Sequence, residues 1–310
     1  MIEHELPLDE NMGESFPGMT FEFPYLWIWG EMDEYIGGHV PWHWHEEVEF
    51  CYVLKGEVEY YMPNEVIALS EGDAMFVNSN VLHMIRSKEG CIGAIIIPQI
   101  INKLLLIGYH RSAFDNKYYR PIVTSENLPY YVMRHNDSYD EKMINIICSC
   151  YKCAENEEFG YEMNVRSDIS KLWLMLYKRV EDQIVKQEHI QNKVGKRLKA
   201  MLTFINKHYT EKISLENIAD AGCIGVRECI RSFKKNMNTT PFQYLQQLRI
   251  ESAANMLLHS EASITEVALK NGFATSSHFS QLFKEYMQCT PKMYRNASRK
   301  NCKQSYLNKT

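Results

Sequence analysis

The sequence predicts an α+β protein of several domains: an N-terminal antiparallel β-barrel, a helical linker and an all-α C-terminal domain. Its 310 residues, 45% hydrophobic and 24% charged, suffice for two or three buried cores. Residues 37–98 show the period-two pattern of short strands, and the chain after about residue 100 shows the longer period of helices. We place the domains at residues 1–105, 106–190 and 191–310.

Short strands separated by turns occupy residues 37–98. Phe50, Tyr52 and Leu54 alternate with Glu49 and other residues of a first strand. A glycine then turns the chain into EVEYYM (57–62), whose apolar residues also occupy every second position. Many short strands at regular spacing predict a small antiparallel barrel or sandwich.

An amphipathic helix is predicted over residues 162–180. Its apolar residues recur at helical spacing and form one stripe: Val165, Ile169, Leu172, Trp173, Leu176 and Val180. The stripe must pack on the barrel, on a neighbouring helix or on a second subunit, and the expectation of a homodimer depends on the last alternative. The polar segment 181–193 is the best candidate for a linker.

Charge is distributed unevenly along the chain. Residues 191–310 carry 19 Lys and Arg against 8 Asp and Glu, a balance of +11, whereas residues 1–190 have a balance of −16. The total is −5. A basic module joined to an acidic one indicates that the C-terminal third meets a polyanion such as nucleic acid.

The C-terminal third contains an internal repeat. The segment SLENIADAGCIGVRECIRSFKKNMNTTPFQYL (214–245) aligns with SITEVALKNGFATSSHFSQLFKEYMQCTPKMYR (263–295). Between the copies a long helix is predicted, opened by Thr240 as N-cap and Pro241 in its first turn.

Each copy has the pattern of a helix-turn-helix. A short helix carries a small residue, Ala219 or Ala268, and a turn with Gly222 or Gly272 leads into a second helix. Two such motifs on a basic domain predict that one chain reads two successive major-groove segments of double-stranded DNA, about 34 Å apart. We expect base or groove contacts from Arg227, Arg231, Ser276, Ser277, His278 and Gln281, and phosphate contacts from Lys234, Lys284 and Arg295.

Residues 197–295 resemble the DNA-binding domain of AraC/XylS-type transcription regulators. The second copy carries most of the resemblance, through Gly272, Phe273, Ser277, His278, Phe279, Phe283, Lys284, Thr290, Pro291, Tyr294 and Arg295. Two residues depart from the family pattern: Gln281 stands where Arg is usual, and Gly225 stands where Ser or Thr usually caps the helix. The resemblance implies a sequence-specific transcription regulator that meets RNA polymerase.

The segment HWHEEVEF (43–50) presents a second kind of chemistry. His43, His45 and Glu49 share one face of a strand because alternate residues point the same way. Two imidazoles and a carboxylate suit a divalent metal. Trp42, Trp44 and Tyr52 flank them and suit either a small polar ligand or ordinary core packing.

The N-terminal part also resembles a cupin. The first cupin motif is complete at Gly37, His43, His45, Glu49 and Gly56, and the second is partial, with Gly72 and His83 in place. The resemblance implies that His83 joins His43, His45 and Glu49 inside the barrel, either as a metal site or as part of an effector pocket that also includes Trp44 and Tyr52. Histidines that only hydrogen-bond strand ends are a third possibility.

The function expected from these features is a ligand-responsive DNA-binding regulator that is not an enzyme. No second carboxylate pair, nucleophile or phosphate-binding glycine loop indicates a reaction. A divalent metal is the one cofactor considered. The alternatives are a cupin metalloenzyme of the dioxygenase or isomerase type, a metal sensor fused to a DNA-binding module, and a scaffold that only dimerises.

The chain is expected to be cytoplasmic, without contact to a membrane. Its first residues, MIEHELPLDENMG, contain no apolar core of a signal peptide, and the apolar run CIGAIIIPQII is too short to span a bilayer. The nine cysteines are then expected as thiols. CSCYKC (148–153) is interpreted as part of a helix with buried thiols rather than as a zinc or redox site.

Overall fold

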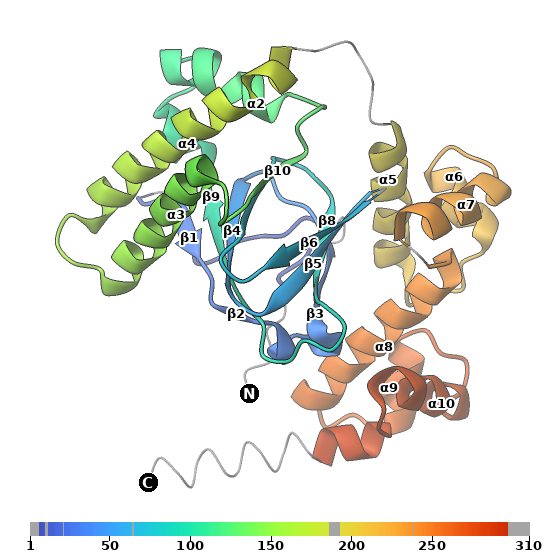
Figure 1. Ribbon diagram of the computed structural model, residues 1–310. Coiled ribbons are helices and arrows are strands. Elements are labelled where there is room, and N and C mark those ends of the chain that lie inside the picture. Colours follow the sequence, from blue (N-terminus) through green and yellow to red (C-terminus); the bar gives the residue numbers. More distant parts are fainter. Residues whose placement is uncertain are drawn as a thin grey trace, which may run out of the picture.

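The computed structural model describes residues 6–9, 12–20, 22–63, 65–185, 193–237 and 239–296. Figure 1 shows the strands at the centre, helices α3 and α4 on one side of them, and helices α5 to α10 on the other. The predicted linker at 181–193 begins within α4, and its residues 186–192 lie outside the described part. No helix of the described residues is long and apolar enough to cross a membrane.

The strands form two antiparallel sheets. The six-stranded sheet has the order β1-β9-β4-β7-β10, with β2 beside β9, and consists of Tyr25–Trp27, Ile95–Ile101, Val48–Lys55, Ala74–Val77, Tyr130–Met133 and Gly30–Glu31. The four-stranded sheet has the order β3-β8-β5-β6 and consists of His39–His43, His83–Ser87, Glu57–Met62 and Glu65–Ser70. No strand pairing closes the two sheets into a barrel among the described residues, and packing holds them together around one core. We keep the term barrel domain for this pair of facing sheets.

Side chains alternate between the two faces of these strands as expected. In β5 the inward residues Val58, Tyr60 and Met62 are buried between the sheets. In β4 Cys51 and Val53 face the same interior, whereas Phe50 faces the opposite way. Both faces of β4 are therefore covered, one by the other sheet and one by helices.

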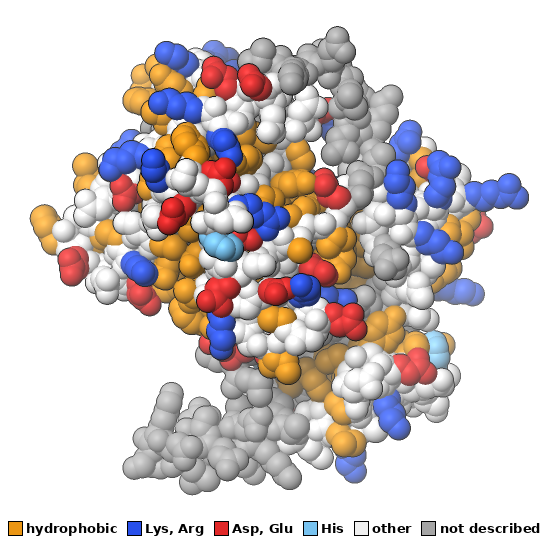
Figure 2. Space-filling view, in the orientation of Figure 1, with side chains coloured by type: hydrophobic (Ala, Val, Ile, Leu, Met, Phe, Trp, Pro, Cys, Tyr) orange, Lys and Arg blue, Asp and Glu red, His pale blue; other side chains and the backbone are white. Residues whose placement is uncertain are grey.

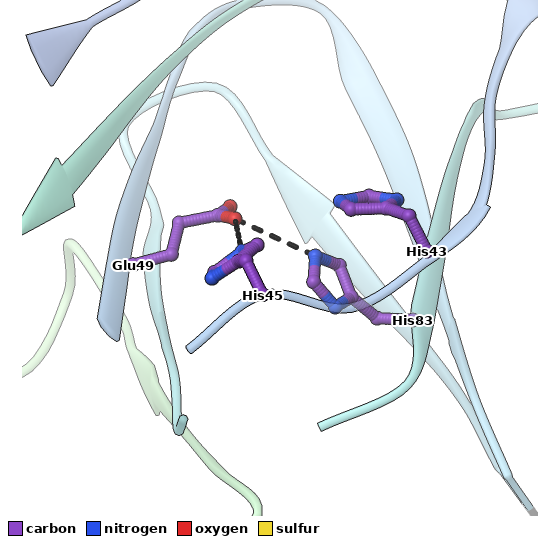
Figure 3. A group of neighbouring side chains, drawn as sticks. All are labelled: His43, His45, Glu49 and His83. Atoms are coloured by element: carbon purple, nitrogen blue, oxygen red, sulfur yellow. Dashed lines mark hydrogen bonds and ion pairs between the residues drawn. The ribbon is translucent and has the colours of Figure 1, made fainter. Parts of the chain in front are cut away.

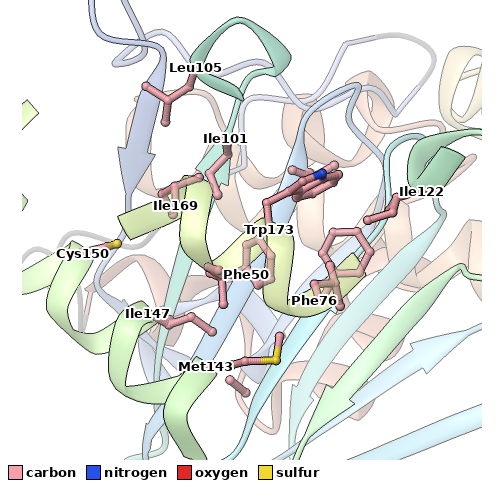
Figure 4. Packing of buried hydrophobic residues seen from close by; sticks show 14 of the residues in the cluster. Phe50, Phe76, Ile101, Leu105, Ile122, Met143, Ile147, Cys150, Ile169 and Trp173 are labelled. Carbon is pink, nitrogen blue, oxygen red and sulfur yellow. The ribbon is translucent and has the colours of Figure 1, made fainter. Parts of the chain in front are cut away.

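Helices α3 (Ser138–Asn156) and α4 (Tyr161–Val185) cover the outer face of the six-stranded sheet. Figure 4 shows Ile147 of α3 and Trp173 of α4 packed with Phe50 and Phe76 of the sheet. All six residues of the predicted apolar stripe are buried in this core. The stripe therefore packs on the barrel domain of its own chain, and it no longer supports a dimer.

Short helical elements lie between the strands, two of them between β2 and β3 and three between β9 and β10. They are the 3-10 turns η1 (Met32–Glu34) and η2 (Ile36–Gly38), α1 (Lys103–Ile107), the π-helical turn η3 (Asp115–Tyr119) and α2 (Arg120–Val123). The CSCYKC segment lies on α3, as expected, with Cys150 fully buried and Cys148 and Cys153 partly buried as free thiols.

The C-terminal region contains the two predicted helix-turn-helix units. The helices are α5 (Lys193–His208), α6 (Leu215–Ala221), α7 (Val226–Met237), α8 (Pro241–His259), α9 (Ile264–Lys270) and α10 (Ser276–Met287). Ser214, Thr240, Ser263 and Thr275 cap four of them through their side-chain oxygens, which accept a backbone N–H in the first turn. Gly225, which precedes α7, has no side chain to do the same.

A β-bulge in β3 determines which side chains face the barrel interior. Val40 pairs with Ile85 and His43 pairs with His83, so three steps along β3 match two along β8. Because of the extra residue, Val40 and His43 both point inward although they are three positions apart. Trp42 consequently points outward, where it packs with α5.

Leu172→Ala should lower the free energy of unfolding by about 2–5 kcal/mol, because it leaves a cavity in the core under α4. Leu174→Ala is the matched control: Leu174 lies on the same helix but is 42% exposed, and its loss should change stability by about 0.5 kcal/mol or less. Chemical denaturation measures both. Equal losses would show that the stripe does not anchor α4.

Candidate metal centre and DNA-binding helices

Four polar side chains converge inside the barrel domain. His43 ends β3, His45 follows it, Glu49 lies in β4 and His83 begins β8. Figure 3 shows them pointing toward one another. Each is at most 2% exposed, and their ligand atoms all lie within 4.8 Å of one another. The structure therefore brings together the set that the cupin resemblance implied.

Backbone carbonyls orient the three imidazoles. Each Nδ1 lies beside the carbonyl oxygen of a residue two positions away: 2.8 Å for His43, 3.0 Å for His45 and 2.9 Å for His83. A proton on each Nδ1 satisfies these carbonyls, so each Nε2 is the nitrogen that points into the site. Fixing the outer nitrogen by hydrogen bonding is how proteins present histidine ligands to a metal.

Glu49 is the central carboxylate. Its Oε2 lies 3.3 Å from Nε2 of His45 and 3.4 Å from Nε2 of His83, and its Oε1 accepts a hydrogen bond of 2.9 Å from the Tyr60 hydroxyl. Burial acts to raise the pKa of Glu49, but the hydrogen bond with His45 and the close contact with His83 outweigh it and hold that pKa well below the ordinary value. Glu49 is therefore an ionised carboxylate.

The histidines around Glu49 differ in their protonation. Burial, together with the neighbouring histidines, holds the pKa of His43 well below its ordinary value, so His43 is neutral. Burial also acts to lower the pKa of His45, but the hydrogen bond to Glu49 more than offsets it and the pKa is raised. One neutral ring and one ring paired with a carboxylate share the site.

The donor set fits a divalent transition metal. Nε2 of His83 is fully buried and has no hydrogen-bond partner among the described residues, because its contact with Glu49 is poorly directed. A buried polar atom without a partner is costly unless something else satisfies it. Three imidazole nitrogens and one carboxylate would hold zinc, iron, manganese or nickel, which can polarise a bound ligand.

The N-terminal segment adds two neighbours that the sequence did not reveal. Glu14 places Oε2 3.4 Å from Nε2 of His43, and burial raises its pKa to about 8. Phe16 packs edge-on against His45 at 5.5 Å. Both also line a pocket of about 220 Å³ beside the centre. A bridge between Gly13 and Trp44 helps to bring this segment to the site, and no sequence pattern marks that pairing.

The two aromatic residues expected in the pocket lie elsewhere. Tyr52 faces the α3 side of the six-stranded sheet, on the opposite face of β4 from Glu49. Trp44 packs with the C-terminal domain, where the Nζ of Lys199 lies 3.1 Å from its ring centre. Tyr60 takes the place expected for them, and its inward position was visible in the alternation of EVEYYM.

The predicted DNA-contacting residues lie on α7 and α10. Arg227, Arg231 and Lys234 of α7 are exposed. Figure 2 shows Lys and Arg side chains gathered at the edge of the molecule over α6 and α7. On α10 all the predicted residues are exposed except Ser276, which is half-buried: Ser277, His278, Gln281 and Lys284.

Three of these residues have partners within the chain. Arg231 forms an ion pair of 2.6 Å with Glu228, one turn away, and Gln281 donates to Glu285. Arg295 is half-buried, and its guanidinium donates to the backbone carbonyls of Leu257 and Ala262. Arg295 therefore ties the segment after α10 to α8. The phosphate contact expected of Arg295 stays a prediction.

Both the N-terminal and the C-terminal region of the chain are similar to known protein families. A cupin domain model matches residues 32–91 and a helix-turn-helix domain model matches residues 218–297. Over 290 residues the chain is 31% identical to the uncharacterized HTH-type transcriptional regulator YdeC of Bacillus subtilis (strain 168), covering 93% of this chain and 97% of YdeC. The chain belongs to the AraC-type family of helix-turn-helix transcription regulators. It is a DNA-binding regulator with a cupin domain.

Other relatives match a shorter part of this AraC-type regulator. The transcriptional activator RhaS of Escherichia coli is 34% identical over 106 residues, which cover 34% of this chain and 38% of RhaS. An AraC-type transcriptional regulator from Chromobacterium violaceum is 26% identical in its crystal structure, with a TM-score of 0.32 over 33% of this chain and 92% of that chain.

Protein purified without a His-tag or chelator should contain about one divalent metal ion per chain, and His83→Ala or Glu49→Gln should lower its affinity by about tenfold or more. Inductively coupled plasma mass spectrometry measures the metal content. His259→Ala is the control, because His259 lies at the exposed end of α8. A folded parent protein that takes up no added metal would contradict this expectation.

Proposed function

We propose that this AraC-type regulator is ligand-responsive and that the buried cluster His43, His45, Glu49 and His83 is its sensing site. The observation that carries the proposal is the contact between the two domains. Strand β3 presents His43 to the cluster and Trp42 to the DNA-binding domain, so one strand borders both. A displacement of His43 is passed to Trp42 because the two residues are neighbours in the chain.

The two domains share one hydrophobic core. Trp42 and Met84 of the four-stranded sheet are buried together with Leu198, Met201 and Leu202 of α5. Close-packed cores transmit small displacements rather than absorbing them. A ligand that favours one arrangement of the strand ends would therefore favour one placement of α5 and of the helix-turn-helix that follows it.

Trp44 forms a second contact of the same kind. It follows His43 in the chain, and Lys199 of α5 lies over its ring. The ammonium of Lys199 faces the indole and is partly removed from solvent, and this burial lowers the pKa of Lys199 to about 8. The contact between a cation and an aromatic ring has a preferred geometry, which makes it sensitive to movement of the strand.

DNA reading is assigned to α7 and α10, one from each helix-turn-helix. The exposed Arg227 and Arg231 of α7 would reach base edges in the major groove, as would Ser276, Ser277, His278 and Gln281 of α10. Phosphates would be held by Lys234, Lys284 and Arg295. On α10, Ser276 and Gln281 are neutral side chains. Most of the positive charge of the two helices therefore lies on α7. We infer that α7 supplies more of the salt-dependent affinity than α10.

The remaining parts of the proposal concern chemistry and partners. We infer a regulator in the cytoplasm that senses and does not catalyse, since its relatives along the whole length and over the DNA-binding domain are transcription regulators. RNA polymerase and a second copy of the chain are the expected protein partners. A dimer would need a surface other than the stripe on α4, which is buried.

Arg231→Ala should weaken binding to a specific operator by about 1–3 kcal/mol and relax the preference at one base pair. The operator is selected from a random duplex library with the parent protein, and affinities are measured by fluorescence anisotropy. Lys178→Ala on α4 is the control for loss of one charge far from the DNA-binding helices. Equal weakening on operator and random duplex would remove the base-reading role.

Trp44→Ala should uncouple DNA binding from the sensing site. In the parent, added zinc or manganese should change operator affinity, and in the variant this change should fall by about fivefold or more while metal content is retained. Trp29→Ala is the matched control, because Trp29 is 37% exposed and its indole N–H donates to Glu31, away from α5. An unchanged metal response in Trp44→Ala would refute coupling through β3.

A further inference from the structure

A second cavity lies between the cupin domain and the DNA-binding domain. Its volume is about 500 Å³, which falls in the range of small-molecule sites. The N-terminal segment, β3, β5 and β8 form one wall, and α5 and α8 form the other. It is distinct from the metal centre: the bulge in β3 sends His43 into the barrel, while His39 points outward into this cavity.

A pair of polar side chains, His39 and Glu251, joins the two walls. Nε2 of His39, on β3, lies 3.4 Å from Oε1 of Glu251, on α8. Gln247, one turn earlier on α8, donates to the same Oε1 at 2.9 Å and lies 3.4 Å from His39. His39 is 3% exposed, and burial raises the pKa of Glu251. The Glu251 carboxylate lies at the cavity wall, where a ligand ammonium can pair with it.

Arg86 supplies the opposite charge. It stands directly across from His39 on β8 and lines the same cavity. Its guanidinium makes no hydrogen bond or ion pair within the part of the chain that the structure describes. Glu59 is its cross-strand neighbour on β5, but the Glu59 carboxylate accepts a hydrogen bond from Tyr61. A guanidinium without such a partner at a cavity wall can pair with the carboxylate of a ligand.

The rest of the lining is apolar or hydroxylated. Trp42, Pro41 and Met84 contribute apolar surface from the sheets, and Leu248 contributes it from α8. Arg86 is the cross-strand partner of His39, and His39 contacts Glu251, so the positive and the negative group meet at the same part of the cavity. The cavity therefore offers an anion site, a cation site and an apolar wall together.

We propose that this cavity binds a small zwitterion of the α-amino acid class with an apolar side chain, whose carboxylate pairs with Arg86 and whose ammonium pairs with Glu251. The side chain lies against Trp42 and Leu248. This site goes beyond the sensing role of the metal centre and does not depend on it. A ligand here bridges the cupin domain to α8, the helix that connects the two helix-turn-helix units.

The test is isothermal titration calorimetry on the full chain with L-leucine, L-methionine and L-phenylalanine as separate probes. At least one should bind saturably, one molecule per chain. 3-Phenylpropanoate has the carboxylate and the ring of L-phenylalanine but no ammonium. It should bind at least about tenfold more weakly than L-phenylalanine, because it lacks one charge-assisted contact.

Two variants assign the charges. Arg86→Gln should weaken the amino acid by about tenfold or more, and it should fold normally because Arg86 is exposed. Glu251→Gln should weaken binding of the amino acid but leave the affinity for 3-phenylpropanoate unchanged. Arg166→Gln, an exposed arginine of α4, is the control.

Three results would each overturn the proposal: no heat of binding with any of the three amino acids at millimolar concentration, equal affinity for 3-phenylpropanoate and L-phenylalanine, or binding that Arg86→Gln leaves intact. Metal content and operator affinity are measured on the same preparations. A failure of the amino acid site with normal metal and DNA binding would leave the sensing role of the metal centre standing.

Discussion

The bulge in β3 is the constraint on which the rest of the structure depends. A regular strand would place Val40 and His43 on opposite faces, because side chains alternate. With one extra residue, the strand keeps Val40 in the barrel core and still directs His43 to Glu49 and His83. The same irregularity turns Trp42 outward. The candidate metal centre and the contact with the DNA-binding domain thus come from a single local departure from regular pairing.

The interface between the domains has two unlike halves. On the α5 side it is a dry hydrophobic core in which Trp42 and Met201 are buried, and such cores resist deformation. On the α8 side it is a hollow lined by His39, Arg86 and Glu251, where charged groups lie beside open space. The α5 side is therefore closed by packing, and the α8 side leaves room for a small molecule.

Local patterns explain why so much could be predicted from the sequence. The alternation in EVEYYM, the N-cap residues Ser214 and Thr240 and the spacing of the two helix-turn-helix units all act over a few residues, and the structure has them where expected. The position of Glu14 beside His43 depends on a pairing between distant segments. The packing partner of the 162–180 stripe also needed the fold, because an apolar stripe does not specify what it meets.

Trp44 and Tyr52 do not line the site that they flank in the sequence. Both flank HWHEEVEF, yet residues next to an inward ligand on a strand point outward, Trp44 toward α5 and Tyr52 toward α3. Aromatic residues beside a metal motif therefore connect the site to its surroundings and do not line it. Met12 extends this connection: it is fully buried in the shared core, its backbone pairs with Trp44, and the Tyr244 hydroxyl of α8 lies 3.8 Å from its sulfur. Two residues further, Glu14 touches His43, so the N-terminal segment links the metal centre to α8 without passing through β3.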